Sequence, residues 1–203
     1  IRGNAHTENE DSILVDQRNN LYAVADGVTM PYGGRKASTH AIEYLRLSFD
    51  EDLLKAVEIS NERLLQEKEA DPTIGTTTLT AAHIRDDELR VAHVGDSSAY
   101  VIKSGETRRV NQLDSVPGTH MLTQVIGQRN LDVHFYEEVL RVGDYVVLAT
   151  DGVTDVITER ELVSMIEEKG DVERIVKEIL SRVDEKPRIY EDDKSAIVIL
   201  VSE

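Results

Sequence analysis

The chain has 203 residues, of which 40% are hydrophobic and only 4% aromatic, so the composition suits one large domain with a mainly aliphatic core. Its 39 acidic residues outnumber its 23 basic ones and give a net charge of −16, which argues against nucleic-acid and anionic-membrane partners, since both need basic surface. Because the sequence has no cysteine, no apolar run long enough to span a membrane and no amino-terminal signal, we expect a single cytoplasmic domain over residues 1–203, without disulfides or thiolate zinc sites.

The first third of the chain is predicted to form a hairpin followed by two helices. Two runs of apolar, β-branched residues flank a polar turn, which is typical of two paired strands. A glycine-rich loop comes next, and apolar residues then recur in two stretches at helical spacing. In chain order these features cover residues 12–15, 16–20, 21–25, 27–34, 35–49 and 53–65.

Short strands dominate the rest of the chain, and helices return near its end. The strand-like runs cover residues 76–84, 89–94, 99–102, 134–140, 145–149 and 196–201. The helical runs cover residues 119–126, 159–168 and 172–183. Because strands cluster instead of alternating with helices, the pattern favours an α+β fold of antiparallel sheets flanked by helices over a doubly wound parallel sheet.

Acidic residues stand where strand-like runs meet turns. Asp26, Asp151 and Asp192 each lie at the edge of an apolar run, and the pair Glu10-Asp11 precedes another. A single Asp-Gly is among the commonest turn signals, but this many acidic strand ends exceeds what turns alone require. Carboxylates gathered in one place repel one another unless a cation holds them, so we predict a divalent metal site and two-metal phosphate chemistry.

The expected ligands are all oxygen atoms, which magnesium and manganese prefer. Zinc more often recruits histidine or cysteine, and the six histidines of the chain show no ligand spacing. We therefore interpret the strand histidines His83, His93 and His134 as surface or core packing residues. The glycine after Asp26 is interpreted as a position where a backbone carbonyl or a bound ion can approach closely.

Seven short motifs run through the chain from end to end, and each one alone is a weak signal. In order they are NEDS at 9–12, VADG at 24–27, GTTT at 75–78, VGDSSAY at 94–100, LTQVIG at 122–127, GDYVVLATDGVTD at 143–155 and DDKSAIVIL at 192–200. Together, and in this order, they resemble the metal-dependent protein phosphatase family, the protein phosphatase 2C-like enzymes. The resemblance covers essentially the whole chain.

The resemblance implies both a fold and an activity. The fold is a four-layer α-β-β-α sandwich, in which two mainly antiparallel sheets lie face to face with helices outside. The activity is hydrolysis of phosphoserine and phosphothreonine in proteins, by a water that bridges two manganese or magnesium ions. A phosphorylated protein would be the substrate.

The same resemblance assigns roles to individual residues. Asp26 would bridge the two ions, and Asp151 and Asp192 would complete one metal site. Glu10 and the Gly27 carbonyl would reach the other site, mostly through water. Two further expectations are that Asp11 orients bound waters and that a weak third ion lies where some family members bind one, at Asp96 and Asp155.

Several positions depart from the family's usual pattern. His6 stands where the family places an arginine that clamps the substrate phosphate, so His6 is a candidate catalytic residue, with Arg2 and Arg35 as possible substitutes. Val28 replaces a histidine that many animal members use as a general acid. The flap of a few dozen residues beside the active site is reduced to residues 116–121.

Two alternatives to an active protein phosphatase remain open. Loss of the phosphate-binding arginine is compatible with a pseudophosphatase that binds a protein partner without turnover, although the complete carboxylate set opposes this. Hydrolysis of small phosphoesters is compatible with the same chemistry. The short flap, together with Asp193 where many members have asparagine, is similar to the bacterial sporulation stage II protein E-like branch.

Overall fold

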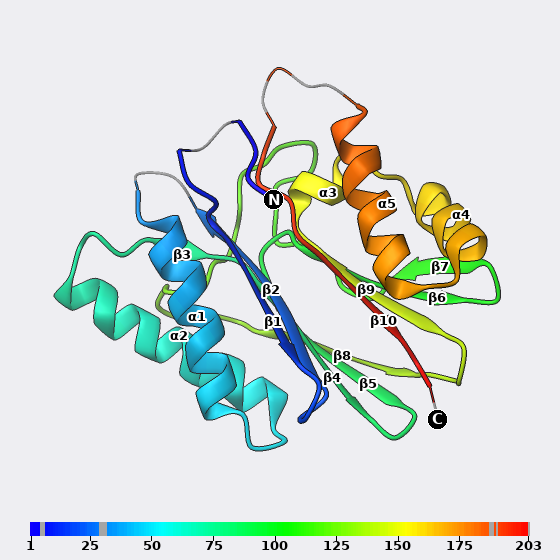
Figure 1. Cartoon of the computed structure of the whole chain (residues 1–203). Helices are drawn as coiled ribbons and strands as arrows, with labels where there is room; N and C mark the ends of the chain where they lie inside the picture. Colours follow the sequence, from blue (N-terminus) through cyan, green and yellow to red (C-terminus); the bar gives the residue numbers. More distant parts are fainter. Residues whose placement is uncertain (5–6, 29–31, 187–188, 190, 203) are drawn as a thin grey trace.

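Two antiparallel β-sheets lie face to face at the centre of the molecule, and helices cover both outer faces (Figure 1). This computed structural model describes residues 1–4, 7–28, 32–186, 189 and 191–202. The predicted α+β fold, a four-layer sandwich, is confirmed.

The larger sheet has six strands in the order β1-β2-β4-β5-β8, with the short β3 paired to the end of β2. Their bounds are β1 (Asp11–Asp16), β2 (Leu21–Val28), β3 (Thr76–Thr77), β4 (Leu79–Arg85), β5 (Glu88–Val94) and β8 (His134–Val139). The predicted hairpin of β1 and β2 is present, and its register places Asp11 directly opposite Asp26. Like charges in directly opposite positions destabilise a sheet, so this pair has a cost that needs another explanation.

The smaller sheet has the order β10-β9-β6-β7, and all its pairs are antiparallel. Its strands are β6 (Ser98–Lys103), β7 (Glu106–Arg109), β9 (Tyr145–Ala149) and β10 (Ala196–Leu200). The core between the sheets is aliphatic, as the composition requires, and includes Val24, Val91 and Leu148. The sequence does not predict β7, because its four residues, ETRR, are polar and carry no apolar alternation.

The helices cover the sheets in two pairs. α1 (Gly34–Ser48) and α2 (Leu53–Ala70) pack on the larger sheet, and α4 (Glu159–Lys169) and α5 (Val172–Asp184) pack on the smaller one. Capping sets where they begin: Asp52 accepts a hydrogen bond from the Lys55 N–H (3.0 Å), and Thr158 and Glu161 form a capping box. Among the helices of the described residues, none is long and apolar enough to cross a membrane.

The helix predicted over residues 119–126 is wrong. Backbone groups of this segment pair with other parts of the chain instead of with each other. The Ile126 N–H donates to the Thr77 carbonyl (2.8 Å), and the Thr123 N–H donates to the Asp114 carbonyl (2.8 Å). Gly127 follows with a φ of 91°, which ends any helical continuation. Tertiary pairing therefore overrides the local apolar spacing.

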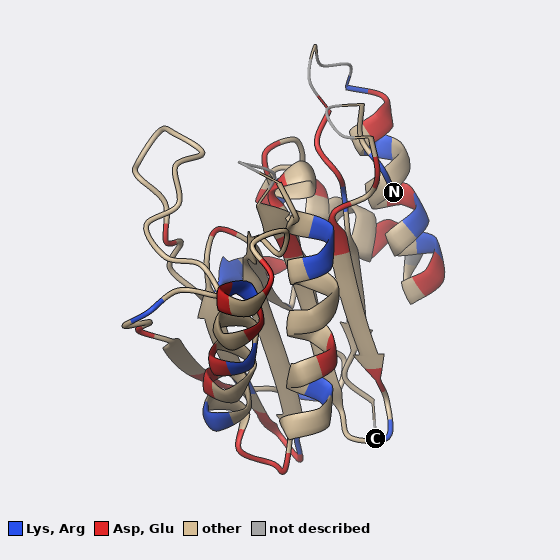
Figure 2. Ribbon diagram, turned by 90° about the vertical axis from the view of Figure 1, so that its left-hand side faces the viewer, with Lys and Arg blue, Asp and Glu red and all other residues tan. Residues whose placement is uncertain are grey.

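Acidic side chains are spread over the helices as well as over the site. In Figure 2 the helices in view carry both acidic and basic residues along their lengths. The sequence composition gives 39 acidic residues, far more than a metal site uses, so much of the negative charge belongs to solvated surface.

Gly27 is required by the packing of α1 against β2. A Cβ at Gly27 would lie 2.3 Å from the carbonyl carbon and oxygen of Gly34, at the first turn of α1. The close approach predicted at this glycine is therefore made by the helix backbone.

Gly27→Ala is expected to lower the free energy of unfolding by about 3 kcal/mol, because the added methyl group meets backbone atoms that cannot rotate away. Urea denaturation of both proteins would measure this loss. Gly118→Ala is the matched control: a Cβ there meets no atom within 4 Å, and its φ of 77° predicts a loss of only about 1 kcal/mol. Equal losses for the two variants would contradict the packing explanation.

Candidate metal centre

Four aspartates from distant parts of the sequence lie together at one end of the two sheets. Asp11 begins β1 and is paired with Asp26 on β2. Asp151 begins the short α3 (Asp151–Thr154), directly after β9, and Asp192 lies just before β10, the strand beside β9. The charges of Asp11, Asp151 and Asp192 all contribute to raising the pKa of Asp26, which requires that they lie close to it.

Hydrogen bonds tie the two sheets together at this point. The Thr150 Oγ1 hydroxyl donates to Oδ2 of Asp11 (3.0 Å), linking β9 of one sheet to β1 of the other. The Thr150 N–H donates to the Ser195 carbonyl (3.1 Å), and the Ser195 N–H donates back to Thr150 Oγ1 (3.0 Å). Thr150 is fully buried, so these contacts hold the ends of β1, β9 and β10 in a fixed arrangement.

Three carboxylates of this cluster, those of Asp11, Asp26 and Asp151, ionise with difficulty because their pKa values are raised. Burial raises the pKa of Asp11 to about 7, and the nearby charges of Asp193 and Asp151 add to the effect. Burial and the charge of Asp192 raise the pKa of Asp151 to about 6. The pKa of Asp26 lies well above its ordinary value, first because of burial and then because of its acidic neighbours. The protein alone therefore leaves this negative charge poorly compensated.

The donor set fits a divalent cation with a preference for oxygen ligands. Oδ1 of Asp11 and Oδ1 of Asp151 are both buried without a hydrogen-bond partner. Buried polar atoms are nearly always paired, so two orphaned carboxylate oxygens in one cluster indicate that the pairing group is an ion or water. Magnesium and manganese are the cations that such an all-oxygen set suits.

Glu10 lies beside this cluster, at the amino-terminal end of α1. Its side chain accepts a hydrogen bond from the Arg35 N–H (3.3 Å), and its carbonyl accepts one from the Gly27 N–H (3.2 Å). The segment around it is held by Asp193, which is fully buried and accepts hydrogen bonds from the N–H groups of Gly3 (2.8 Å) and Glu10 (2.7 Å). Each of these bonds uses a different carboxylate oxygen. An asparagine at this position would have only one side-chain oxygen and could accept only one of these two bonds. The two hydrogen bonds therefore explain why an aspartate is needed at position 193.

The residues predicted to bind the substrate phosphate are His6, Arg2 and Arg35. His6 falls outside the described residues. Arg2 donates to the Thr7 carbonyl (2.9 Å), and Arg35 donates to the Asn9 carbonyl, so both guanidinium groups contact the chain that leads into β1. Val28 ends β2.

Asp96 belongs to the same acidic region, and it is contributed by the turn after β5. It follows β5 in a turn, and only 9% of its surface is exposed. Burial raises its pKa to about 7, with further contributions from the charges of Asp151 and Asp155. The residues that line a cavity of about 360 Å³ include Asp96, Asp151, Asp155 and His120. His120 is a lone, exposed histidine in a loop, so its sequence context gives no signal.

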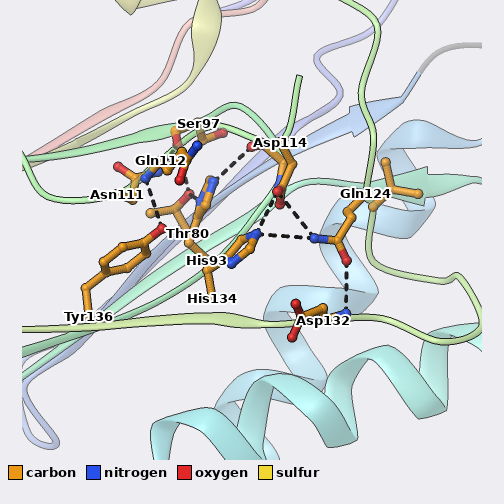
Figure 3. Close-up of polar contacts among 12 residues, drawn as sticks. Thr80, His93, Ser97, Asn111, Gln112, Asp114, Gln124, Asp132, His134 and Tyr136 are labelled. Carbon is orange, nitrogen blue, oxygen red and sulfur yellow. Dashed lines mark hydrogen bonds and ion pairs between the residues drawn. The ribbon is translucent and has the colours of Figure 1, made fainter. Parts of the chain in front are cut away.

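The strand histidines differ in their surroundings. His83 and His93 are buried, as predicted for packing residues, and burial lowers the pKa of His93 to about 4. His93 bridges the Thr80 hydroxyl and the Gly95 carbonyl, at 2.8 Å each. His134 instead has a polar role, with its Nε2 2.8 Å from Oδ1 of Asp114 (Figure 3).

Comparison with known sequences identifies the family. Residues 3–190 match the family described as Protein phosphatase 2C. The chain belongs to the protein phosphatase 2C family. The serine/threonine protein phosphatase PstP of Mycobacterium tuberculosis is 29% identical over 195 residues, covering 82% of this chain and 37% of that protein. Protein phosphatase PhpP of Streptococcus pneumoniae is 27% identical over 195 residues, covering 79% of each chain.

Known structures show the same fold. The catalytic domain of PstP, solved in complex with two manganese ions, matches with a TM-score of 0.85 at 22% identity, covering 98% of this chain and 93% of that one. The chain spans just over a third (37%) of the length of the curated PstP protein.

Proposed function

We propose that this member of the protein phosphatase 2C family is a metal-dependent serine/threonine protein phosphatase that hydrolyses phosphoserine and phosphothreonine in proteins. The observation that carries the proposal is the cluster of Asp11, Asp26, Asp151 and Asp192. Burial and neighbouring charges raise the pKa of Asp11, Asp26 and Asp151, and Oδ1 of Asp11 and Oδ1 of Asp151 are buried without a hydrogen-bond partner, so the cluster calls for a cation. The likeness to PstP and PhpP supports the same activity.

The proposed ligands are those that the motifs predict. Asp26 would lie between two cations, Asp151 and Asp192 would complete one site, and Glu10 with the Gly27 carbonyl would serve the other. When bound, the two manganese or magnesium ions would lower the pKa of a water and neutralise charge on the phosphoryl group.

The chain's own residues would position the reactants around that centre. Oδ1 of Asp11 is buried and has no partner among the described residues, so it can accept a hydrogen bond from the water and orient it. Thr150 holds the other oxygen of Asp11 in place. His6, in the position of the family's arginine, is proposed to face the substrate phosphate.

The substrate side of the proposal follows from the reduced flap. Only residues 116–121 lie between the two flanking motifs, so a phosphorylated segment would meet an open site. Attraction of the phosphate would come mainly from the bound cations, which lets a chain of net charge −16 bind an anion. Action in the cytoplasm on a phosphorylated protein stays a prediction.

Hydrolysis of a phosphothreonine peptide by the purified protein is the direct test. We expect phosphate release with manganese, none with EDTA, and recovery when manganese is restored. Manganese binding without phosphate release from any phosphopeptide would contradict the proposal and favour the pseudophosphatase alternative. Faster release from small metabolite phosphates than from phosphopeptides would favour the small-phosphoester alternative.

A further inference from the structure

Hydrogen bonds hold both the backbone and the side chain of Glu10. Its N–H donates to Oδ2 of Asp193 (2.7 Å), its carbonyl accepts from the Gly27 N–H (3.2 Å), and its Oε1 accepts from the Arg35 N–H (3.3 Å). Glu10 and the Gly27 carbonyl are the groups proposed to serve one of the two metal sites. The contacts that fix Glu10 therefore also set the geometry of that site.

A fully buried serine on α1 makes a further and shorter contact with Glu10. Oγ of Ser38 lies 2.5 Å from the Glu10 carbonyl oxygen, and none of the Ser38 surface is exposed. A hydroxyl group has a single hydrogen to donate. The Arg35 carbonyl is a second acceptor for this hydrogen, but it lies farther away, at 3.1 Å. The shorter distance assigns the Ser38 hydrogen to Glu10.

Ser12 extends this contact into a chain of hydroxyl groups. Its Oγ lies 2.9 Å from Oγ of Ser38. Because Ser38 uses its own hydrogen on the Glu10 carbonyl, Ser12 is the donor of this pair. Donation from Ser12 polarises the Ser38 hydroxyl and strengthens the bond that the hydroxyl makes to Glu10. The chain therefore links β1, α1 and the residue that precedes β1.

The start of α1 depends on Glu10 in turn. The N-cap residue of this helix, Gly33, has no side chain that could accept a hydrogen bond, and its first turn contains no acidic residue. The Arg35 N–H of that turn donates instead to Oε1 of Glu10, whose negative charge suits the positive end of the helix dipole. Glu10 and α1 are therefore joined at the backbone through Ser38 and at the side chain through Arg35.

The other metal site has a separate support in the smaller sheet. The Thr150 N–H donates to the Ser195 carbonyl (3.1 Å), and the Ser195 N–H donates to Oγ1 of Thr150 (3.0 Å). These two bonds join the segments that carry Asp151 and Asp192, at the ends of β9 and β10, whereas α1 packs on the larger sheet (Figure 1). A change on α1 is therefore expected to affect one metal site more than the other.

We propose that Ser38 is a positioning residue of the metal centre: its hydroxyl, polarised by Ser12, holds the Glu10 carbonyl and so sets where Glu10 stands relative to the Gly27 carbonyl. Ser38 acts through Glu10 and does not itself bind the ion or the substrate. The inference rests on the proposed function, because it takes Glu10 and the Gly27 carbonyl as the groups that serve one ion.

Manganese binding by the substrate-free protein tests the proposal. The wild type is expected to bind two manganese ions that lie roughly 3.5–4 Å apart, and this proximity gives a magnetically coupled electron paramagnetic resonance spectrum. Ser38→Ala should weaken one of the two ions by about tenfold in equilibrium dialysis and leave the other unchanged. At a manganese concentration between its two dissociation constants, this variant should give the spectrum of an isolated ion. Ser12→Ala should weaken the same ion by a smaller factor, because Ser38 keeps its own hydrogen.

Ser60→Ala is the matched control. Ser60 is also fully buried, and its hydroxyl also donates to a backbone carbonyl of α1, that of Ala41 (2.9 Å), which is not a proposed metal ligand. Ser38→Ala and Ser60→Ala should therefore lose similar free energies of unfolding by urea denaturation in EDTA, while Ser60→Ala keeps both manganese affinities.

Two results would overturn the positioning role and leave the proposed phosphatase function standing. One is unchanged affinity for both manganese ions in Ser38→Ala or in Ser12→Ala. The other is an equal loss of manganese affinity in Ser38→Ala and Ser60→Ala, which would make the effect one of packing alone. A wild-type protein that binds no manganese would overturn both this inference and the proposed function.

Discussion

Asp151→Asn is expected to reduce the turnover of a phosphothreonine peptide by about 100-fold or more, because even residues that only support metal ligands cost 10- to 100-fold when changed. Asp151 has a central position: its charge adds to burial in raising the pKa of Asp26, burial and the charge of Asp192 raise its own pKa, and its Oδ2 lies 3.9 Å from Nδ1 of His120. Asparagine keeps its size and removes its charge. The measurement is the turnover number across a manganese titration, in which the apparent manganese affinity should also fall.

The free energy of unfolding shows whether the loss of turnover in Asp151→Asn comes from the metal centre or from an unfolded protein. In EDTA, Asp151→Asn should be more stable than the wild type near pH 7.5, because one charge is removed from a cluster of like charges. Asp86→Asn is the control: Asp86 is exposed in a turn with a φ of 54°, which asparagine tolerates, so activity and stability should both stay near wild type. Full activity in Asp151→Asn would remove Asp151 from the metal centre.

Much of the fold could be predicted because its elements bury regular apolar patterns. β9 occupies the predicted range, Tyr145–Ala149, and α1 differs from its prediction by one residue at each end. The failures occur where a distant partner decides the local structure. Residues 119–126 have helical spacing, yet their backbone pairs with Thr77 and Asp114, and the polar β7 exists only because β6 lies beside it.

The same distinction between local pattern and distant contact applies to the residues of the site. The aspartates could be selected because each follows or precedes an apolar run, and the structure brings Asp11, Asp26, Asp151 and Asp192 together. His120 could not be selected, because its contacts with Asp151 and Asp155 depend on a hairpin whose path no local pattern specifies. The signal that was available is the shortness of the segment 116–121, which confines this loop to the neighbourhood of the site.

Asp11→Asn is expected to stabilise the metal-free protein, and to do so more strongly at high pH than at low pH. Burial raises the pKa of Asp11 from its ordinary 3.8 to about 7 in the folded state, so the folded protein holds a proton that the unfolded chain has already lost. The free energy of unfolding of the wild type therefore falls as the pH rises through this window, and levels off above it. The variant lacks this term and keeps a carbonyl oxygen that can accept the hydrogen bond from Thr150.

The advantage of Asp11→Asn over the wild type should grow by roughly 2 kcal/mol between about pH 5 and about pH 7.5, measured by urea denaturation in EDTA. The comparison must be between the two proteins, because the lowered pKa of buried His93 makes the stability of both rise with pH over part of the same range. Manganese should reverse the order near pH 7.5, because a ligand that binds only the folded state stabilises it and wild-type Asp11 supports that binding. An advantage that is independent of pH in EDTA would show that Asp11 is ionised throughout the range, and the carboxylate cluster would then not need a cation to compensate it.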